Sequence, residues 1–115
     1  EDKEAGFDHS PFGMIGFETA FGLAMQELVE KKILTLPKLV EKMSAMPACI
    51  LGLDKKGIIK EGKDADLVMV DLDKEWTFNK ENIASKSKNS PFIGRTFKGC
   101  VEATIFGGKI VYRNK

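Results

Sequence analysis

The chain has 115 residues, of which 43% are hydrophobic and 30% charged, a composition typical of a globular protein and unlike a disordered segment. Its 18 basic and 17 acidic residues give a net charge of +1, which provides no electrostatic support for a nucleic-acid or membrane partner. No apolar run approaches the roughly 18 residues of a membrane span and no basic-then-apolar leader opens the chain, so we expect a soluble cytoplasmic protein.

The first ten residues are polar and carry no hydrophobic period, which predicts a loop and suggests a chain cut from something longer. Asp8, His9 and Ser10 are the candidates for metal-ligand or acid–base chemistry there. One imidazole cannot build a histidine-rich zinc site, and the sequence places no base beside the serine. We therefore expect Asp8-His9-Ser10 to be a solvated loop.

A Pro11-Phe12-Gly13 turn follows. Proline fixes φ, and glycine lets the backbone approach another group closely. Such a turn is either plain punctuation or a rigid loop that faces a ligand, and composition alone favours punctuation.

Apolar residues from Phe17 to Lys32 recur at three- and four-residue steps, which predicts an amphipathic helix. Gly22 falls on the opposite side and costs about 1 kcal/mol relative to alanine in a helix interior, so it marks a position of close packing. Glu27 and Lys31 can pair at i,i+4. The stripe expected to face the core consists of Phe17, Phe21, Ala24 and Leu28.

A second helix is expected to begin at Thr35, a good N-cap, with Pro37 tolerated in its first turn. The Met46-Pro47 step should end this helix, and Pro47 should begin a short third one. Gly52 lies where a left-handed C-terminal cap is expected. The apolar face of the second helix is predicted to contain Leu39, Val40 and Met43.

The stretch from Gly57 to Asp71 joins the helical half to a predicted sheet. Gly57 and Gly62 should supply turns, and the apolar run from Leu67 to Val70 predicts a short strand covered on both faces, which Asp71 ends. Further on we predict strands over 75–78 and 95–106, a helical turn over 82–84, a polar loop over 85–90, a tight Gly107-Gly108 turn, and a returning strand with Ile110 and Tyr112.

These elements predict an α+β architecture in two blocks, three helices followed by about four to five strands. So few strands leave unprotected sheet edges, which indicates that a partner segment is missing. Cys49 and Cys100 are solitary and lie in apolar segments, so we expect two buried reduced thiols. With one histidine and no CxxC, the chain alone has little capacity for metal chemistry.

Four segments carry a family resemblance. GIIKEGKDADLVMVD, from Gly57 to Asp71, resembles the C-terminal signature of the cyclic amidohydrolases, and VEATIFGGKIVY resembles their final hairpin. PFGMIGFETAF, from Pro11 to Phe21, and SKSKNSPFIGRTFKG, from Ser85 to Gly99, resemble the type I dihydroorotases. Dihydropyrimidinases and allantoinases share the first signature but differ in these last two motifs.

The resemblance implies a C-terminal fragment. The family fold is a (β/α)₈ metal-dependent hydrolase barrel beside a small β-sandwich built from both chain ends. Residues 1–54 would be the C-terminal end of the barrel, with its last segment, substrate loop and helices. Residues 55–115 would be the C-terminal strands of the composite sandwich.

The resemblance also implies the activity: zinc-dependent, reversible hydrolysis of dihydroorotate to N-carbamoyl-L-aspartate in pyrimidine biosynthesis. The family's zinc ligands and catalytic aspartate would lie upstream, so no catalytic or metal residue is expected in this chain, and the isolated chain should be inactive. Asp8 and His9 would mimic an upstream family motif by accident. Phe12 and Gly13 match the loop whose backbone touches the substrate ring, and Pro11 would set that turn.

The implied partners are the remainder of the dihydroorotase chain, the substrate, a second copy in a homodimer, and aspartate carbamoyltransferase. A different class of reading remains open, namely a non-catalytic homologue that serves as a scaffold for aspartate carbamoyltransferase. A third is an independent binding module, which would have to melt cooperatively as a monomer.

Overall fold

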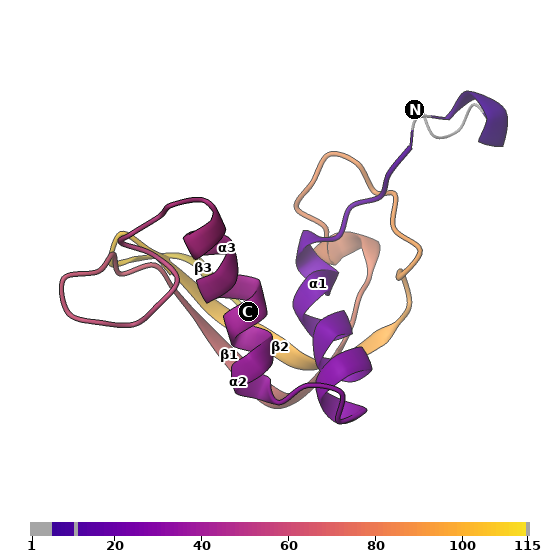
Figure 1. The fold of residues 1–115 in the computed structure, drawn as a ribbon. Helices are drawn as coiled ribbons and strands as arrows, with labels where there is room; N and C mark the ends of the chain where they lie inside the picture. The colour runs from indigo at the N-terminus through magenta and orange to yellow at the C-terminus, as the bar shows by residue number, and fades with distance from the viewer. Residues whose placement is uncertain (1–5, 11, 115) are drawn as a thin grey trace.

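The computed structural model of the chain describes residues 6–10 and 12–114. Helices occupy the first half, and an antiparallel sheet of order β1-β2-β3 occupies the second, so the predicted α+β class is confirmed (Figure 1). The elements in chain order are η1 (Phe7–His9), α1 (Phe17–Ala24), η2 (Met25–Glu30), α2 (Leu36–Val40), η3 (Glu41–Ala45), α3 (Met46–Ile50), β1 (Leu67–Thr77), η4 (Lys80–Asn82), β2 (Thr96–Phe106) and β3 (Lys109–Arg113).

The first long helix runs from Phe17 to Glu30, with α1 continuing into the π-helical turns of η2. Its length agrees with the prediction, but its buried face does not. Phe17 is fully exposed, whereas the buried positions are Thr19, Gly22 and Met25. The helix packs closely on β2, and it can do so only on the face where Gly22 leaves room for Phe97. That face is therefore the buried one.

The second helical run begins after Thr35, with Pro37 in its first turn, as predicted. It does not end at Met46-Pro47. The π-helical turns of η3 precede the proline, the Met46 N–H bonds the Glu41 carbonyl, and the helix continues through α3 to Gly52, whose φ of +67° confirms the left-handed cap. The predicted apolar face holds only for Leu39, because Val40 and Met43 are exposed.

The strand predicted over 67–70 extends to Thr77 and merges with most of the separate strand predicted over 75–78, leaving Phe78 outside it. Asp71 interrupts the ladder without ending the strand: its Oδ1 accepts the backbone N–H groups of Asp73 and Lys74 at 3.0 and 3.1 Å. The pairing with β2 is irregular between Asp71 and Glu75 for this reason.

The described residues form three strands rather than four or five. Gly107 and Gly108 join β2 to β3 with φ values of +55° and +77°, a pair of left-handed residues that suits a tight hairpin and confirms the predicted turn. Strands β1 and β3 are the sheet edges, and all of β3 is exposed. Val68 and Met69 are more than half exposed, so coverage of β1 on both faces is not observed.

The core lies where α1 meets the start of β2. Phe78, Ile83 and Phe97 form its buried cluster, and Trp76 packs on Phe97 with ring centroids 5.4 Å apart. The Trp76 Nε1–H donates to the Gly99 carbonyl at 3.1 Å, which ties this ring to β2.

Helix α1 approaches the sheet through two glycines. A Cβ on Gly22 would lie 3.0 Å from Phe97, and a Cβ on Gly99 would lie 3.3 Å from the Phe21 ring. The expectation that Gly22 marks close packing is therefore confirmed, although it lies on the buried side and not on the outer one.

Of the two cysteines, Cys100 is buried as predicted and Cys49 is exposed. The radius of gyration is 16.2 Å, against about 13 Å for a compact domain of 100 residues, and the longest dimension is 51 Å. An elongated chain covers fewer of its own side chains, which accounts for the exposed Cys49 and Phe17. Within the part of the chain that the structure describes, no helix is both long and apolar enough to span a bilayer.

Candidate functional site

The predicted substrate loop is an extended segment that leads into α1. Phe12 is fully exposed, and Gly13 adopts φ +98°, a conformation that side-chain-bearing residues rarely take. Pro11, expected to set this turn, lies outside the described residues. The structure thus presents Phe12 and Gly13 at the surface with backbone groups that a ligand could reach.

Asn89 holds this loop from the other end of the sequence. Its side-chain Nδ2 donates to the Gly13 carbonyl at 2.8 Å, and its backbone carbonyl accepts the Ile15 N–H at 3.0 Å. The predicted polar loop over 85–90 therefore makes a specific contact that the sequence does not predict. Its composition gave no signal, and only its place in a family motif marked it.

The segment that carries Asn89 is itself anchored. The Lys88 amine donates to the carbonyl of buried Ile83 at 2.6 Å, and the Glu18 carboxylate accepts the Ala84 N–H at 3.1 Å. In Figure 1 the orange segment before β2 runs beside the indigo segment that enters α1. The two motifs that resemble the dihydroorotases are thus one structural unit.

An open, mainly apolar hollow of about 910 Å³ adjoins this unit. That volume lies within the range of small-molecule sites, which is roughly 300–1,000 Å³. Glu18 is the charged side chain among its lining residues, which are Met14, Ile15, Gly16, Phe17, Glu18, Ala20, Ala84 and Ser85.

Among the described residues, Asp8 and His9 are not part of a group of side chains that could hold a metal ion. Both are exposed on η1, a 3₁₀ turn where a loop was predicted, and the Ser10 hydroxyl donates to the Gly6 carbonyl at 2.8 Å. Across residues 6–10 and 12–114, no three side chains of His, Cys, Asp or Glu come close enough together to hold a metal ion. These residues do not fit a zinc centre, so no chemical step through a metal is derived from them.

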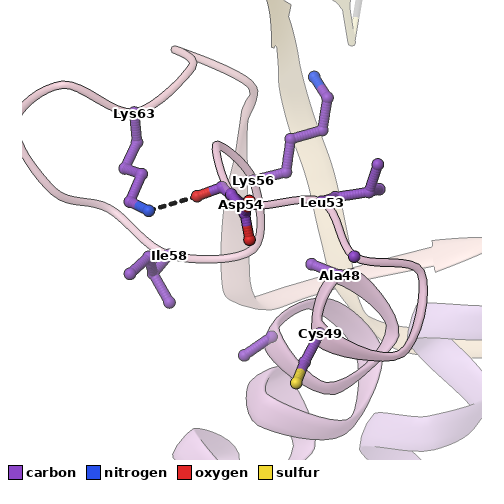
Figure 2. Close-up of a pocket in the computed structure, with 9 residues that line it drawn as sticks. Ala48, Cys49, Leu53, Asp54, Lys56, Ile58 and Lys63 are labelled. Carbon is purple, nitrogen blue, oxygen red and sulfur yellow. Dashed lines mark hydrogen bonds between the residues drawn. The ribbon is translucent and has the colours of Figure 1, made fainter.

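A second hollow, of about 270 Å³, lies at the end of α3 (Figure 2). The Lys63 amine crosses it to bond the Asp54 carbonyl. The exposed Cys49 and the Ala48 side of α3 form another wall. The main polar contact of this hollow joins two residues of the chain, Lys63 and Asp54. We therefore interpret it as part of a stabilised loop and not as a ligand site.

Lys56, beside that hollow, makes two ion pairs. Its amine bonds Asp66 and lies 3.0 Å from the Asp64 carboxylate, and these contacts raise the pKa of Lys56. Asp66 also accepts the Gly107 N–H at 2.8 Å. The Lys56 amine first, and then the Gly107 N–H, lower the pKa of Asp66. Asp66 therefore joins the glycine-rich approach to the final hairpin.

Residues 5–111 match the model of the Amidohydrolase family. The chain is 50% identical over 113 residues to a dihydroorotase of Endomicrobium trichonymphae, covering 98% of this chain and 27% of that protein. It is 48% identical over 113 residues to a dihydroorotase of Elusimicrobium minutum, covering 98% of this chain and 26% of that protein. It thus spans about a quarter of the length of these relatives, and the predicted resemblance to dihydroorotases is confirmed.

Solved structures with a similar fold carry a different name. An L-hydantoinase (dihydropyrimidinase) from Arthrobacter aurescens superposes with a TM-score of 0.87 at 34% identity, over 97% of this chain and 26% of that one. A D-hydantoinase (dihydropyrimidinase) from a Thermus species gives a TM-score of 0.85 at 26% identity, over 96% of this chain and 24% of that one. The arrangement of helices and strands described above is therefore shared with these proteins.

Proposed function

Since this chain belongs to the amidohydrolase family, we propose that it is part of a dihydroorotase. The reaction is the reversible hydrolysis of the cyclic amide of (S)-dihydroorotate to N-carbamoyl-L-aspartate, a step of pyrimidine biosynthesis. One observation carries the proposal: identity reaches 50% with proteins named dihydroorotase, against 34% with the hydantoinase of the best superposition given above.

The contribution proposed for this chain is substrate binding by the backbone of Phe12 and Gly13. Dihydroorotate is a polar ring, and stiff main-chain groups can orient such a ring at little entropic cost. The positive φ of Gly13 and its bond to Asn89 support this role, because both restrict the loop to one conformation.

We assign residues 1–54 to the end of a (β/α)₈ barrel and residues 55–115 to a composite β-sandwich. The exposed apolar side chains of α1 and β1 and the unpaired edges of the sheet support additional covering segments. Zinc, which supplies an activated hydroxide in this class of enzyme, would be held by residues outside this chain. A cytoplasmic homodimer is part of the same proposal.

Two alternatives have distinct signatures. A hydantoinase is favoured by the superposition with proteins of that name. A non-catalytic scaffold for aspartate carbamoyltransferase would keep this part of the fold while lacking activity.

The test is hydrolysis by the full-length protein that carries this chain, measured with dihydroorotate and with hydantoin. We expect dihydroorotate to be the better substrate by kcat/KM. A preference for hydantoin would overturn the assignment in favour of a hydantoinase. Loss of all hydrolysis together with co-purification of aspartate carbamoyltransferase would establish the scaffold.

A further inference from the structure

We propose that Asn89 is a positioning residue for the substrate: through the Gly13 carbonyl and the Ile15 N–H, it sets the direction of the backbone groups of the Phe12–Gly13 loop. The inference rests on the proposed function and goes beyond it, because it names a residue that does not itself contact the substrate. The two contacts join positions 76 and 74 residues apart in sequence.

The geometry follows from the planarity of the peptide bond. The C=O of Gly13 and the N–H of Met14 belong to one rigid plane and point in opposite directions. When Asn89 Nδ2 bonds the Gly13 oxygen at 2.8 Å, the plane is fixed. The Ile15 N–H, bonded to the Asn89 carbonyl at 3.0 Å, fixes the next plane. Met14 is therefore held on both sides by one residue.

This restraint acts on a segment that would otherwise be free to rotate. Gly13 has no Cβ and reaches both signs of φ, so its conformation in isolation is weakly defined. Packing does not restrict it sterically, since a Cβ built on Gly13 would meet no atom within 4 Å among the described residues other than its chain neighbours. Hydrogen bonding by Asn89, rather than packing, selects φ +98°.

Asn89 can serve this purpose because its own position comes from the core. Lys88, the preceding residue, bonds the carbonyl of Ile83, which belongs to the buried cluster with Phe78 and Phe97. On the other side, the Ser90 hydroxyl accepts the Phe92 N–H at 3.3 Å. The side-chain amide of Asn89 thus connects the surface loop to a segment that is fixed by the core.

Two substitutions test the idea in the full-length protein. Asn89→Ala removes the donor, and Asn89→Asp keeps the size but places an acceptor against the Gly13 carbonyl. A loop contact made equally in the ground state and the transition state changes KM and leaves kcat. Loss of one hydrogen bond that orients it should raise KM for dihydroorotate about three- to tenfold, with kcat within about twofold.

Two controls separate positioning from stability. Lys86→Ala alters an exposed side chain of the same loop. Asn79→Ala removes the side-chain half of the capping box of η4, destabilising the neighbourhood of the core without touching Gly13. Both controls should leave KM unchanged, and both Asn89 variants should also lower the preference for dihydroorotate over hydantoin.

The outcomes are distinct. If the wild-type protein hydrolyses dihydroorotate and both Asn89 variants have the same KM as the wild type, this inference is overturned and the proposed function is not. A KM that rises equally in Asn79→Ala would also overturn it, because destabilisation would then be sufficient. Absence of wild-type turnover would overturn the proposed function, and this inference with it.

Discussion

Gly22 on α1 lies against Phe97 on β2 so closely that a methyl group on the glycine would meet the Cβ and Cγ of Phe97 at 3.0 Å. Phe97 is fully buried, and Trp76 packs on its ring, so it has no free direction in which to move. The contact sets the spacing between helix and sheet, and through α1 it sets the position of the candidate substrate loop.

Gly22→Ala should therefore destabilise the chain. Alanine gains about 1 kcal/mol of helix propensity, but overpacking a filled core costs about 1–3 kcal/mol, and we expect a net loss of about 1 kcal/mol. Urea unfolding followed by the fluorescence of Trp76, the single tryptophan, measures it.

Ala20→Gly is the matched control, because Ala20 is exposed on the same helix. It should lose about 1 kcal/mol from propensity alone. If Gly22→Ala instead raised the free energy of unfolding by as much as Ala20→Gly lowers it, Phe97 would have to move freely and the packing argument would be wrong.

The Asp66 carboxylate should stabilise the chain in a pH-dependent way. Its pKa in the folded chain lies below its ordinary value of 3.8, because the Lys56 amine and then the Gly107 N–H favour the charged form. The unfolded chain therefore binds more protons in the window just below 3.8, and stability falls there as the pH is lowered. Above 3.8 the contribution is complete.

Asp66→Asn should accordingly be less stable than wild type at pH 7, with a gap that closes as the pH falls through the folded-state pKa. Asp64→Asn is the control, since Asp64 lies 3.0 Å from Lys56 and makes no contact with Gly107. Its effect should be smaller. The measurement is the free energy of unfolding at pH 7, 5 and 3. A difference between wild type and Asp66→Asn that stays constant with pH would contradict this explanation.

The two thiols should react at very different rates in the 115-residue chain. Cys49 is exposed, whereas Cys100 is buried and burial raises its pKa. Since the thiolate is the reactive form, Cys100 should be alkylated at least about tenfold more slowly at pH 8. Mass spectrometry after timed iodoacetamide treatment follows both sites.

Single variants assign the two phases. Cys49→Ser should leave only the slow phase, and Cys100→Ser only the fast one. Equal rates at the two sites in the folded chain would contradict the burial of Cys100.

The elements governed by local chemistry were predictable from sequence, and those governed by contacts were not. The Gly107-Gly108 turn and the Gly52 cap follow from the freedom of glycine to take positive φ. The face of α1 did not follow, because periodicity located an apolar stripe while the sheet chose the face with Gly22. The composition around Asp71 predicts a strand end, although in the structure its side chain only replaces part of the ladder.

The candidate site divides in the same way. Phe12 and Gly13 were indicated by a motif that resembles a family, and the structure shows where they lie. Asn89 also lies in such a motif, but the sequence does not predict it as a site residue, because an asparagine in a polar loop is compatible with solvation. Its contact with Gly13 depends on a fold that joins distant segments.

The isolated chain should bind no stoichiometric zinc and should not hydrolyse dihydroorotate. Within residues 6–10 and 12–114 no cluster of three ligating side chains exists, and zinc sites in proteins use at least three protein ligands. Dialysis against zinc followed by metal analysis, with a parallel assay of dihydroorotate hydrolysis, measures both quantities. His9→Ala is the control, because His9 is the single histidine and is exposed on η1. The variant should match the wild type in metal content. One zinc ion per chain that disappears in His9→Ala would instead assign a metal to the Asp8-His9 segment, and would contradict the proposal that the metal is held outside this chain.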